Sequence, residues 1–217
     1  QKDNKEMIKH RRFQNDPELY PKLTTLLHLS GGQDSVYVAW RWLQDHPDEA
    51  ILLHHINLVA RGENRLVQEN RAVRKALDYF QSKGLDNFVY YESDFSYGNL
   101  PRISIKDIQI CTVFSSIILR TPSFRNIKTL LLSWHLNEVN APGIDRGFRV
   151  KALLKAFEIE GIQLEFPIGE MTRRQMADDM PEDLLKLVHT CRKPDKRGAC
   201  GKCKTCKEMK EAGIFRG

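Results

Sequence analysis

The sequence predicts an α/β protein with a doubly wound, mainly parallel sheet and a small C-terminal zinc-binding appendage. Three observations lead to this prediction. Short apolar runs alternate with segments of helical periodicity along most of the 217-residue chain. A turn with two adjacent glycines follows the first apolar run, at residues 31 and 32. Four cysteines gather near the C-terminus, at positions 191, 200, 203 and 206.

The first half of the chain supplies three strands and two helices. Residues 23–29 are apolar and form the first strand, and residues 36–43 place apolar side chains at helical spacing. A second apolar run, 51–59, predicts the next strand. Residues 66–80 carry an apolar stripe and predict a long helix, and residues 88–91 predict a short third strand.

The second half continues the alternation. Residues 107–120 predict a helix in spite of their Ile, Val and Thr content, and residues 128–133, with three consecutive leucines, predict the fourth strand. A helix is expected over 148–160, and a last strand over 163–166, before a proline. Two short helices are expected at 172–179 and 182–188. Ligands of such sheets bind beyond the C-terminal ends of the strands.

This division predicts three parts. They are a polar N-terminal arm (1–20), a phosphate-loop nucleotide-binding domain (21–190) and a four-cysteine tail (191–217). The net charge of +6 lies in the tail, since residues 191–217 contain nine Lys and Arg against three Asp and Glu, whereas residues 1–190 contain 25 of each. A basic tail favours contact with nucleic acid or an anionic substrate, although four zinc-bound thiolates would lower its charge.

The composition favours a cytoplasmic protein. The hydrophobic fraction is 41% and the charged fraction 29%, and no apolar run approaches the ~20 residues of a membrane span. No membrane partner is expected. The first 20 residues lack the apolar centre of a secretory signal.

Residues 30–35 read Ser-Gly-Gly-Gln-Asp-Ser and predict an anion-binding loop. Two adjacent glycines let the backbone approach an anion, and the following helix directs N–H groups and its positive dipole end at it. Ser30 and Ser35 add hydroxyl donors, and Asp34 is the residue type that holds magnesium. An ordinary strand-to-helix turn needs only one of these residues. The pattern is neither the Walker loop nor Gly-x-Gly-x-x-Gly.

The tail cysteines predict a structural metal site. Cys200, Cys203 and Cys206 are separated by two residues each, and Cys-x-x-Cys spacing lets two thiolates reach one tetrahedral ion. We expect zinc, bound by Cys191 and these three. Disulfides, a redox pair and an iron–sulfur cluster are the alternatives. Cys111 stands apart in an apolar segment, where a small buried residue is the usual role.

Ser-Gly-Gly-x-Asp-Ser after the first strand resembles the signature of the PP-loop ATP pyrophosphatases, which cleave ATP between its α and β phosphates. The resemblance implies an adenine nucleotide alpha-hydrolase-like fold and an adenylyl transfer to an oxygen of the substrate. It also implies ATP and Mg²⁺ as cofactors. The loop residues would bind ATP, with Asp34 as the magnesium partner and a catalytic residue. These loop residues are Ser30, Gly31, Gly32, Gln33, Asp34 and Ser35.

The loop together with the tail cysteines also resembles the 7-cyano-7-deazaguanine synthase family. Residues 167–172 and the helix around Glu69 and Ala72 fit that family too. The loops at 57–62, 101–107 and 143–146 depart from the pattern of that family. The resemblance therefore supports the reaction with ATP more strongly than it supports the family's substrate.

The second resemblance implies that ATP activates the carboxylate of 7-carboxy-7-deazaguanine and that ammonia displaces AMP, giving the nitrile after a second activation. His135 is a candidate catalytic proton shuttle, with an ordinary loop-filling histidine as the alternative. The other candidate pocket residues lie beyond the fourth strand. They are Ser133, Asn137, Glu138, Asp145 and Arg146.

Two further classes of function stay open. One keeps the ATP chemistry but uses a protein or nucleic acid as the acceptor, and the other is a non-catalytic zinc-bearing nucleotide-binding module. The expected partners are a small deazapurine substrate and ammonia, with a macromolecular acceptor and a homodimer as alternatives. His54 and His55 are adjacent on a strand and face opposite sides of the sheet, so they do not share one site.

Overall fold

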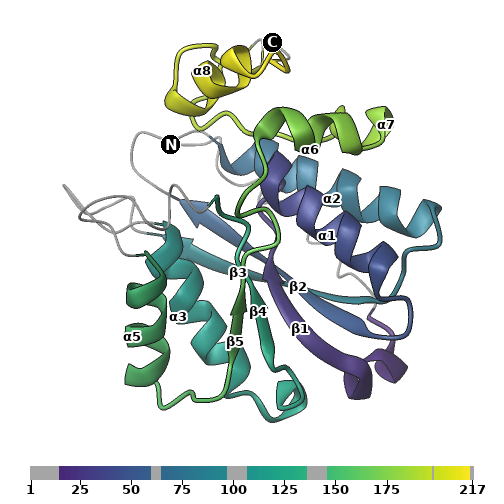
Figure 1. Cartoon of the computed structure of the whole chain (residues 1–217), viewed down its shortest axis with the longest axis vertical. Coiled ribbons are helices and arrows are strands. Elements are labelled where there is room, and N and C mark those ends of the chain that lie inside the picture. The colour runs from purple at the N-terminus through teal and green to yellow at the C-terminus, as the bar shows by residue number, and fades with distance from the viewer. Residues whose placement is uncertain (1–14, 60–64, 97–106, 136–145, 197, 216–217) are drawn as a thin grey trace, which may run out of the picture.

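The computed structural model describes residues 15–59, 65–96, 107–135, 146–196 and 198–215 (Figure 1). Its centre is a sheet of five strands in the order β3-β2-β1-β4-β5, and every neighbouring pair is parallel. The chain starts in the middle of the sheet and winds outward in both directions. The doubly wound parallel sheet is therefore confirmed. The strands are β1 (Leu23–His28), β2 (Ala50–Val59), β3 (Phe88–Ser96), β4 (Thr129–Leu131) and β5 (Gln163–Glu165).

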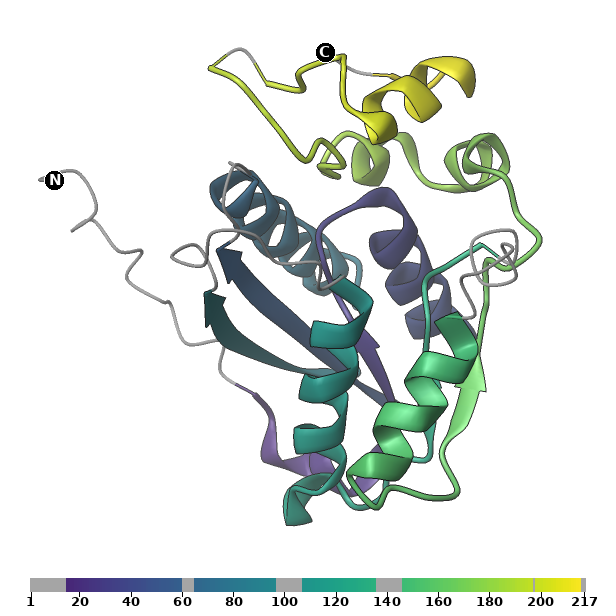
Figure 2. The same ribbon diagram turned by 90° about the vertical axis from the view of Figure 1, so that its left-hand side faces the viewer.

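Helices cover both faces of the sheet, as Figures 1 and 2 show. One face carries α1 (Gln33–Asp45) and α2 (Leu66–Ser82), and the other carries α3 (Asp107–Leu119) and α5 (Arg146–Ala156). Three short helices lie beyond the C-terminal ends of the strands: α6 (Arg173–Asp179), α7 (Glu182–Leu185) and α8 (Lys204–Glu211). Two 3₁₀ turns, Pro17–Lys22 and Pro122–Phe124, lie at the opposite end.

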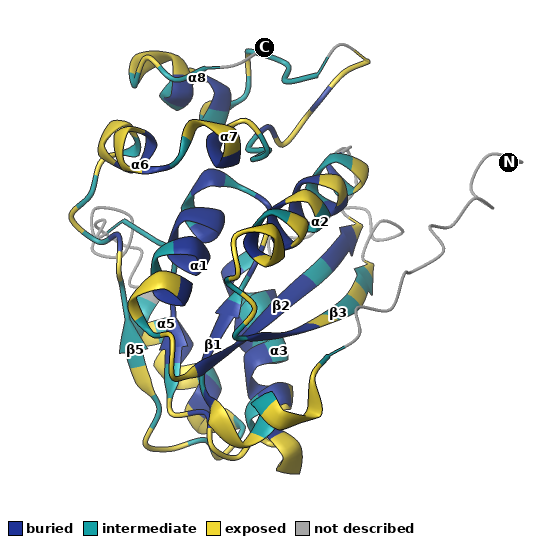
Figure 3. Ribbon diagram, turned by 90° about the vertical axis from the view of Figure 1, so that its right-hand side faces the viewer, coloured by how far each residue is buried: buried dark blue, intermediate teal, exposed yellow. Residues whose placement is uncertain are grey.

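Alternating side chains of the central strands build a separate core on each face. Leu53 packs in the core with α1 and α2, whereas its neighbour Leu52 packs in the core with α3 and α5. This follows from the period of two along a strand, and both residues are fully buried. Figure 3 shows β1 and β2 as the most deeply buried strands. Apolar residues on both faces explain why these strands read as continuous apolar runs.

The third strand is longer than the sequence predicts. Residues 88–91 were expected, but β3 extends to Ser96 and pairs with β2 as far as Val59. Its second half is mostly polar and partly or fully exposed, whereas Phe88, Val89 and Tyr90 are buried. The side chain of Asn15 closes part of this edge, since its amide nitrogen donates to the Tyr90 carbonyl (3.0 Å) and its oxygen accepts from the Tyr90 N–H (2.8 Å).

Several other boundaries differ from the prediction. The helix expected over 148–160 starts at Arg146 and ends at Ala156, and Glu158 adopts a left-handed φ of 57° that is incompatible with further helix. The fourth strand is shorter, Thr129–Leu131, and the helix expected over 182–188 ends at Leu185. The part of the chain that the structure describes contains no helix with the length and apolar character to span a bilayer.

Candidate functional site

The predicted phosphate loop follows β1 and runs into the first turn of α1. Gly32 is the N-cap of α1, so the first N–H groups of that helix face the loop. Ser35 ties the turn together: its hydroxyl accepts from the Ser30 N–H (3.0 Å) and lies 2.9 Å from the Ser30 hydroxyl. The result is a short concave turn of N–H and O–H donors at the positive end of a helix, which is chemically suited to an anion.

Gly31 is required by the shape of this turn. Its φ is +77°, a conformation that L side chains rarely adopt, and a Cβ would lie 2.9 Å from the Glu69 carbonyl oxygen. The Ala72 Cβ and a Val73 methyl are also within 3.2 Å of that position. The loop therefore packs directly on the first turns of α2, and a side chain at Gly31 would push the two apart.

Asp34 meets two cationic or titratable side chains from distant parts of the chain. Arg173, the first residue of α6, donates from Nη1 to the Asp34 carboxylate at 2.7 Å. His135, just beyond β4, places its Nε2 at 3.9 Å from the same carboxylate oxygen. The structure thus brings together the two residues that the sequence suggests as catalytic, and it adds Arg173 to them.

Sequence reasoning missed Arg173. Its local setting is readable, since Thr172 and Gln175 form a capping box that starts α6 directly before it. What the sequence does not show is that α6 returns to the phosphate loop. The backbone of α6 also contacts the phosphate loop, because the Gln33 side-chain amide donates to the Arg173 carbonyl at 2.9 Å.

Buried polar atoms without a hydrogen-bond partner gather around this end of the sheet. Folded proteins rarely leave such atoms unpaired, so water or a polar ligand is expected to bind them. Within the described residues the set includes Gln33 Oε1, both amide atoms of Asn57, Gln68 Oε1 and His135 Nε2. Gln33 and Asn57 are also almost fully buried, with 0% and 5% exposure. These donors and acceptors suit a polar ligand better than an apolar molecule.

The candidate pocket residues are only partly covered by the structure. Ser133 follows β4, two residues before His135, and is partly buried. Arg146 is the first residue of α5. Asn137, Glu138 and Asp145 lie outside the described residues. The substrate pocket proposed from the sequence therefore stays a prediction.

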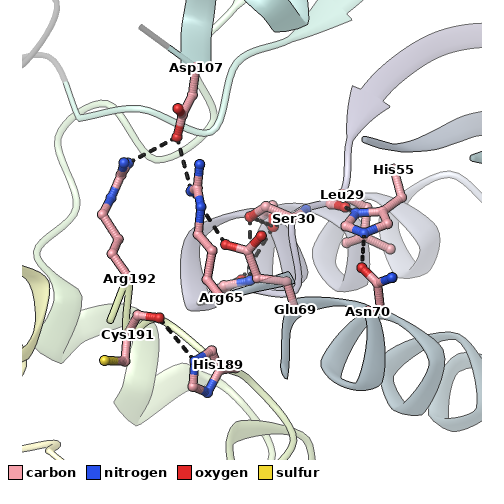
Figure 4. A network of polar contacts seen from close by, with 12 residues as sticks. Leu29, Ser30, His55, Arg65, Glu69, Asn70, Asp107, His189, Cys191 and Arg192 are labelled. Atoms are coloured by element: carbon pink, nitrogen blue, oxygen red, sulfur yellow. Dashed lines mark hydrogen bonds and ion pairs between the residues drawn. The ribbon is translucent and has the colours of Figure 1, made fainter. Parts of the chain in front are cut away.

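An ion-pair network joins the first turn of α2 to the first turn of α3 and to the tail (Figure 4). Arg65 donates to Asp107 at 3.0 Å and lies 3.4 Å from Glu69, and Arg192 approaches Asp107 at 3.1 Å. Burial by itself would raise the pKa of Asp107, but the two guanidinium groups lower that pKa below its ordinary value. Asp107 is therefore a stable anion that holds Arg65 and Arg192 beside the phosphate loop.

His54 and His55 face opposite sides of the sheet, as the sequence predicts. His55 contacts the Leu29 carbonyl (2.8 Å) and Asn70 of α2 (2.9 Å). His54 lies on the α3 side, with its Nδ1 3.1 Å from the His28 Nδ1 and its Nε2 2.8 Å from the Ser93 hydroxyl. One of the two Nδ1 atoms must donate to the other, so the ring that accepts is neutral. Burial lowers the pKa of His28 to about 4 and that of His54 to about 2.

The lowered pKa values of His28 and His54 predict that the protein loses stability in mild acid. Their pKa values are lower in the folded than in the unfolded chain, so the unfolded chain takes up protons first as the pH falls below about 6.5. Each is expected to remove about 2 kcal/mol from the free energy of unfolding at pH 5. Urea unfolding at pH 7, 6 and 5 measures the slope.

Two variants separate this titration from simple damage to the core. His54→Gln removes one titrating group, so we expect roughly half of the slope between pH 7 and 5. Ser93→Ala removes the hydroxyl partner of His54 but keeps the imidazole. It should lower stability at every pH and retain the full slope. An unchanged slope in His54→Gln would refute the assignment.

The four tail cysteines converge on one point. Their sulfur atoms all lie within 4.8 Å of one another, with Cys203 and Cys206 at 3.4 Å and Cys200 and Cys206 at 4.0 Å. Tetrahedral metal–sulfur bonds of about 2.3 Å need sulfurs about 3.8 Å apart. These distances fit a single tetrahedral ion.

Backbone N–H groups point at these sulfurs. Cys200 accepts from the N–H groups of Lys202 (3.5 Å) and Cys203 (3.4 Å), which lower its pKa to about 6, and Cys191 accepts from the Cys200 N–H at 3.2 Å. Such donors stabilise thiolates, the form that binds metals. Cys111 is outside this set, and burial raises its pKa to about 12, so its thiolate is scarce at neutral pH.

No protein-family model and no curated protein matches the chain. Solved structures do match. One is a U34-tRNA thiolase, NcsA from Methanococcus maripaludis with its [4Fe-4S] cluster, at 15% identity and a TM-score of 0.50, covering 89% of this chain. Another is NMN synthetase from Francisella tularensis, at 11% identity and a TM-score of 0.39, covering 91% of this chain and 80% of that one.

The present chain spans 65% of the length of the thiolase, just under two thirds. At 15% identity this likeness concerns the fold. Together with the strand order and the loop geometry, it supports the fold class predicted from the sequence. The chain has a parallel α/β fold like that of this solved structure, and near its C-terminus four cysteine sulfurs lie close enough together to bind one metal ion.

Proposed function

We propose that this protein cleaves ATP between its α and β phosphates and transfers the adenylyl group to an oxygen of an acceptor. The observation that carries the proposal is the convergence on Asp34 of His135 and Arg173 at the mouth of the glycine turn. An anion cradle, an acid, a cation and an imidazole at one point are the groups that phosphoryl chemistry needs.

Each residue has a role in this proposal. The donors of residues 30–35 bind the pyrophosphate half of ATP. Asp34 and the phosphates would hold Mg²⁺, which neutralises their charge when bound. Arg173 lies 2.7 Å from Asp34 and adds positive charge where the leaving pyrophosphate gains negative charge. His135 shuttles a proton to or from the acceptor.

The proposed acceptor is the carboxylate of 7-carboxy-7-deazaguanine. A carboxylate oxygen attacks the α phosphorus, the bond to the bridging oxygen breaks, and pyrophosphate leaves with the electron pair. Ammonia then attacks the activated carbonyl, and AMP leaves to give an amide. A second adenylation, on the amide oxygen, lets AMP leave again as the amide nitrogen loses two protons and becomes a nitrile. Activation is needed because a carboxylate is a poor electrophile.

A macromolecular acceptor is the second candidate, favoured by the charge of the tail. The segment just before Cys191 contacts the phosphate loop, because the His189 N–H donates to the Gly31 carbonyl at 2.8 Å. A polyanion bound along the tail would therefore lie close to the ATP site. The exposed lysines of the tail are Lys193, Lys196, Lys202, Lys204, Lys207 and Lys210.

We also propose that the tail metal is zinc, as expected for four thiolates in the reducing cytoplasm. All four coordination positions would be taken by cysteine sulfur. The ion would then stabilise the tail and leave no open position for substrate.

Product analysis tests the proposed reaction. The protein is incubated with ATP, magnesium, ammonium and 7-carboxy-7-deazaguanine, and nucleotides and deazapurines are separated by chromatography. AMP, pyrophosphate and a nitrile product are expected. AMP that forms only after RNA or protein is added would favour the macromolecular acceptor. Release of ADP in place of AMP would refute the assignment of the loop. If ATP is not cleaved under any condition, the protein would be a non-catalytic nucleotide-binding module.

A matched pair of variants localises the activity. Asp34→Asn is expected to lower the rate of AMP formation by at least about a hundredfold, because it removes the metal-binding charge at the phosphates. Asp45→Asn makes the same chemical change at the other end of α1, where Asp45 is half exposed and pairs with Arg41. Its rate should equal that of the unmodified protein, and equal losses in both variants would contradict the role of Asp34.

A further inference from the structure

The four-cysteine tail and the residues just before it contact the phosphate loop and its neighbours at three places. His189, two residues before Cys191, donates its N–H to the Gly31 carbonyl at 2.8 Å. Arg192, directly after Cys191, pairs with Asp107 at 3.1 Å. Glu208 on α8 pairs with Arg173 at 3.4 Å. Figure 4 shows the first part of the tail beside Ser30 and Arg65.

Arg173 uses two different nitrogens for its two partners. Nη1 lies 2.7 Å from Asp34, and Nη2 lies 3.4 Å from Glu208. The Arg173 side chain is only 16% exposed, and those of Asp34 and Glu208 are 25% and 29% exposed, so solvent screens these pairs less than surface pairs. One guanidinium thus bridges the phosphate loop and the metal-binding tail.

We propose that Glu208 is a positioning residue for nucleotide binding, and that the tail is therefore a working part of the ATP site. This inference rests on the proposed function. When Asp34 turns to the magnesium of Mg-ATP, Nη1 of Arg173 is released toward the phosphates. Glu208 keeps hold of Nη2, so the guanidinium stays at the loop and pairs with a phosphate.

The tail metal would fix the position of the Glu208 carboxylate, which holds Arg173 at the loop. α8 begins directly after Cys203, and Cys206 lies in its first turn. Glu208 follows two residues later, and its backbone carbonyl accepts from the N–H of Ala212, the C-cap of α8 (3.0 Å). Because two metal ligands anchor the start of a helix only eight residues long, removal of the metal frees the helix and, with it, the partner of Arg173.

The test compares two glutamates on the same helix. Glu208→Gln and Glu211→Gln each remove one charge from α8, but Glu211 is exposed and lies three residues further on. Affinity for α,β-methylene-ATP with magnesium is measured by calorimetry. We expect about fivefold weaker binding for Glu208→Gln and no change for Glu211→Gln. Chelation of the tail metal should weaken binding by the unmodified protein at least as much.

A double-mutant cycle distinguishes positioning from general support. If Glu208 acts through Arg173, then Glu208→Gln has no further effect on affinity in an Arg173→Ala background. A purely structural role gives additive losses, which would overturn the proposal. So would equal affinities of Glu208→Gln and Glu211→Gln while the unmodified protein binds ATP. If the unmodified protein binds no nucleotide, the proposed function fails first, and this inference fails with it.

Discussion

Gly31→Ala is expected to abolish ATP binding and to lower the free energy of unfolding by about 3 kcal/mol. Two effects add. A left-handed φ of +77° is strained for alanine, and the new Cβ would meet the Glu69 carbonyl at 2.9 Å. Backbone on both sides must move, which opens the donor turn. Urea unfolding measures the stability, and calorimetric titration with Mg-ATP measures the binding.

Gly84→Ala provides the control for this prediction. Gly84 also has a left-handed φ, +72°, but no atom lies within 4 Å of the position of its Cβ. It ends α2 far from the loop, so only the backbone strain applies, about 1 kcal/mol, and ATP binding is retained. If the two variants lost equal stability, the close contact between the loop and α2 would be wrong.

Cys206→Ala is expected to remove the tail metal. Loss of one of four ligands should lower metal affinity by at least about a hundredfold and unfold the tail, since a small metal site and its fold form together. The sulfur of Cys206 lies 3.4 Å from that of Cys203 and 4.0 Å from that of Cys200, so it is central to the set. Elemental analysis should find one metal ion per chain before the change and almost none after it.

Hydrogen exchange shows whether the tail unfolds with the metal. The N–H of Lys207 donates to the carbonyl of the N-cap Cys203 and that of Ala212 to the carbonyl of Glu208, both at 3.0 Å, and both should lose protection in Cys206→Ala. Cys111→Ala is the control, because Cys111 lies in α3 outside the sulfur cluster. It should keep both the metal and the protection. Metal loss in the Cys111 variant would mean that the ligand set has been misassigned.

The sequence predicts the central strands well because their burial on both faces is visible as an apolar pattern in the sequence. β1 and β2 are apolar on both faces and bury residues in two cores, which leaves a continuous apolar run. The edge strand is harder to predict, since β3 becomes mostly polar after Tyr90, and its extension to Ser96 follows from its pairing with β2. The end of α5 depends on one left-handed residue, Glu158, a residue type that rarely takes that conformation.

In the candidate site, too, some residues can be predicted from local sequence patterns and others cannot. The loop and the tail cysteines are local patterns, so their geometry follows from adjacent residues. The meeting of His135 with Asp34 follows from the pairing of β4 with β1, which the fold class implies. Arg173 and Glu208 are contacts over long sequence distances between short helices, and no periodicity or spacing in the sequence points to either of them.

Asn15 limits how this protein can associate. Open strand edges invite the addition of another strand, either from a second copy or from a misfolded chain. The Asn15 amide already takes both backbone groups of Tyr90, at 3.0 and 2.8 Å, so an incoming strand would have to displace it before pairing in the middle of β3. Asn15 therefore protects the middle of β3 against the addition of another strand.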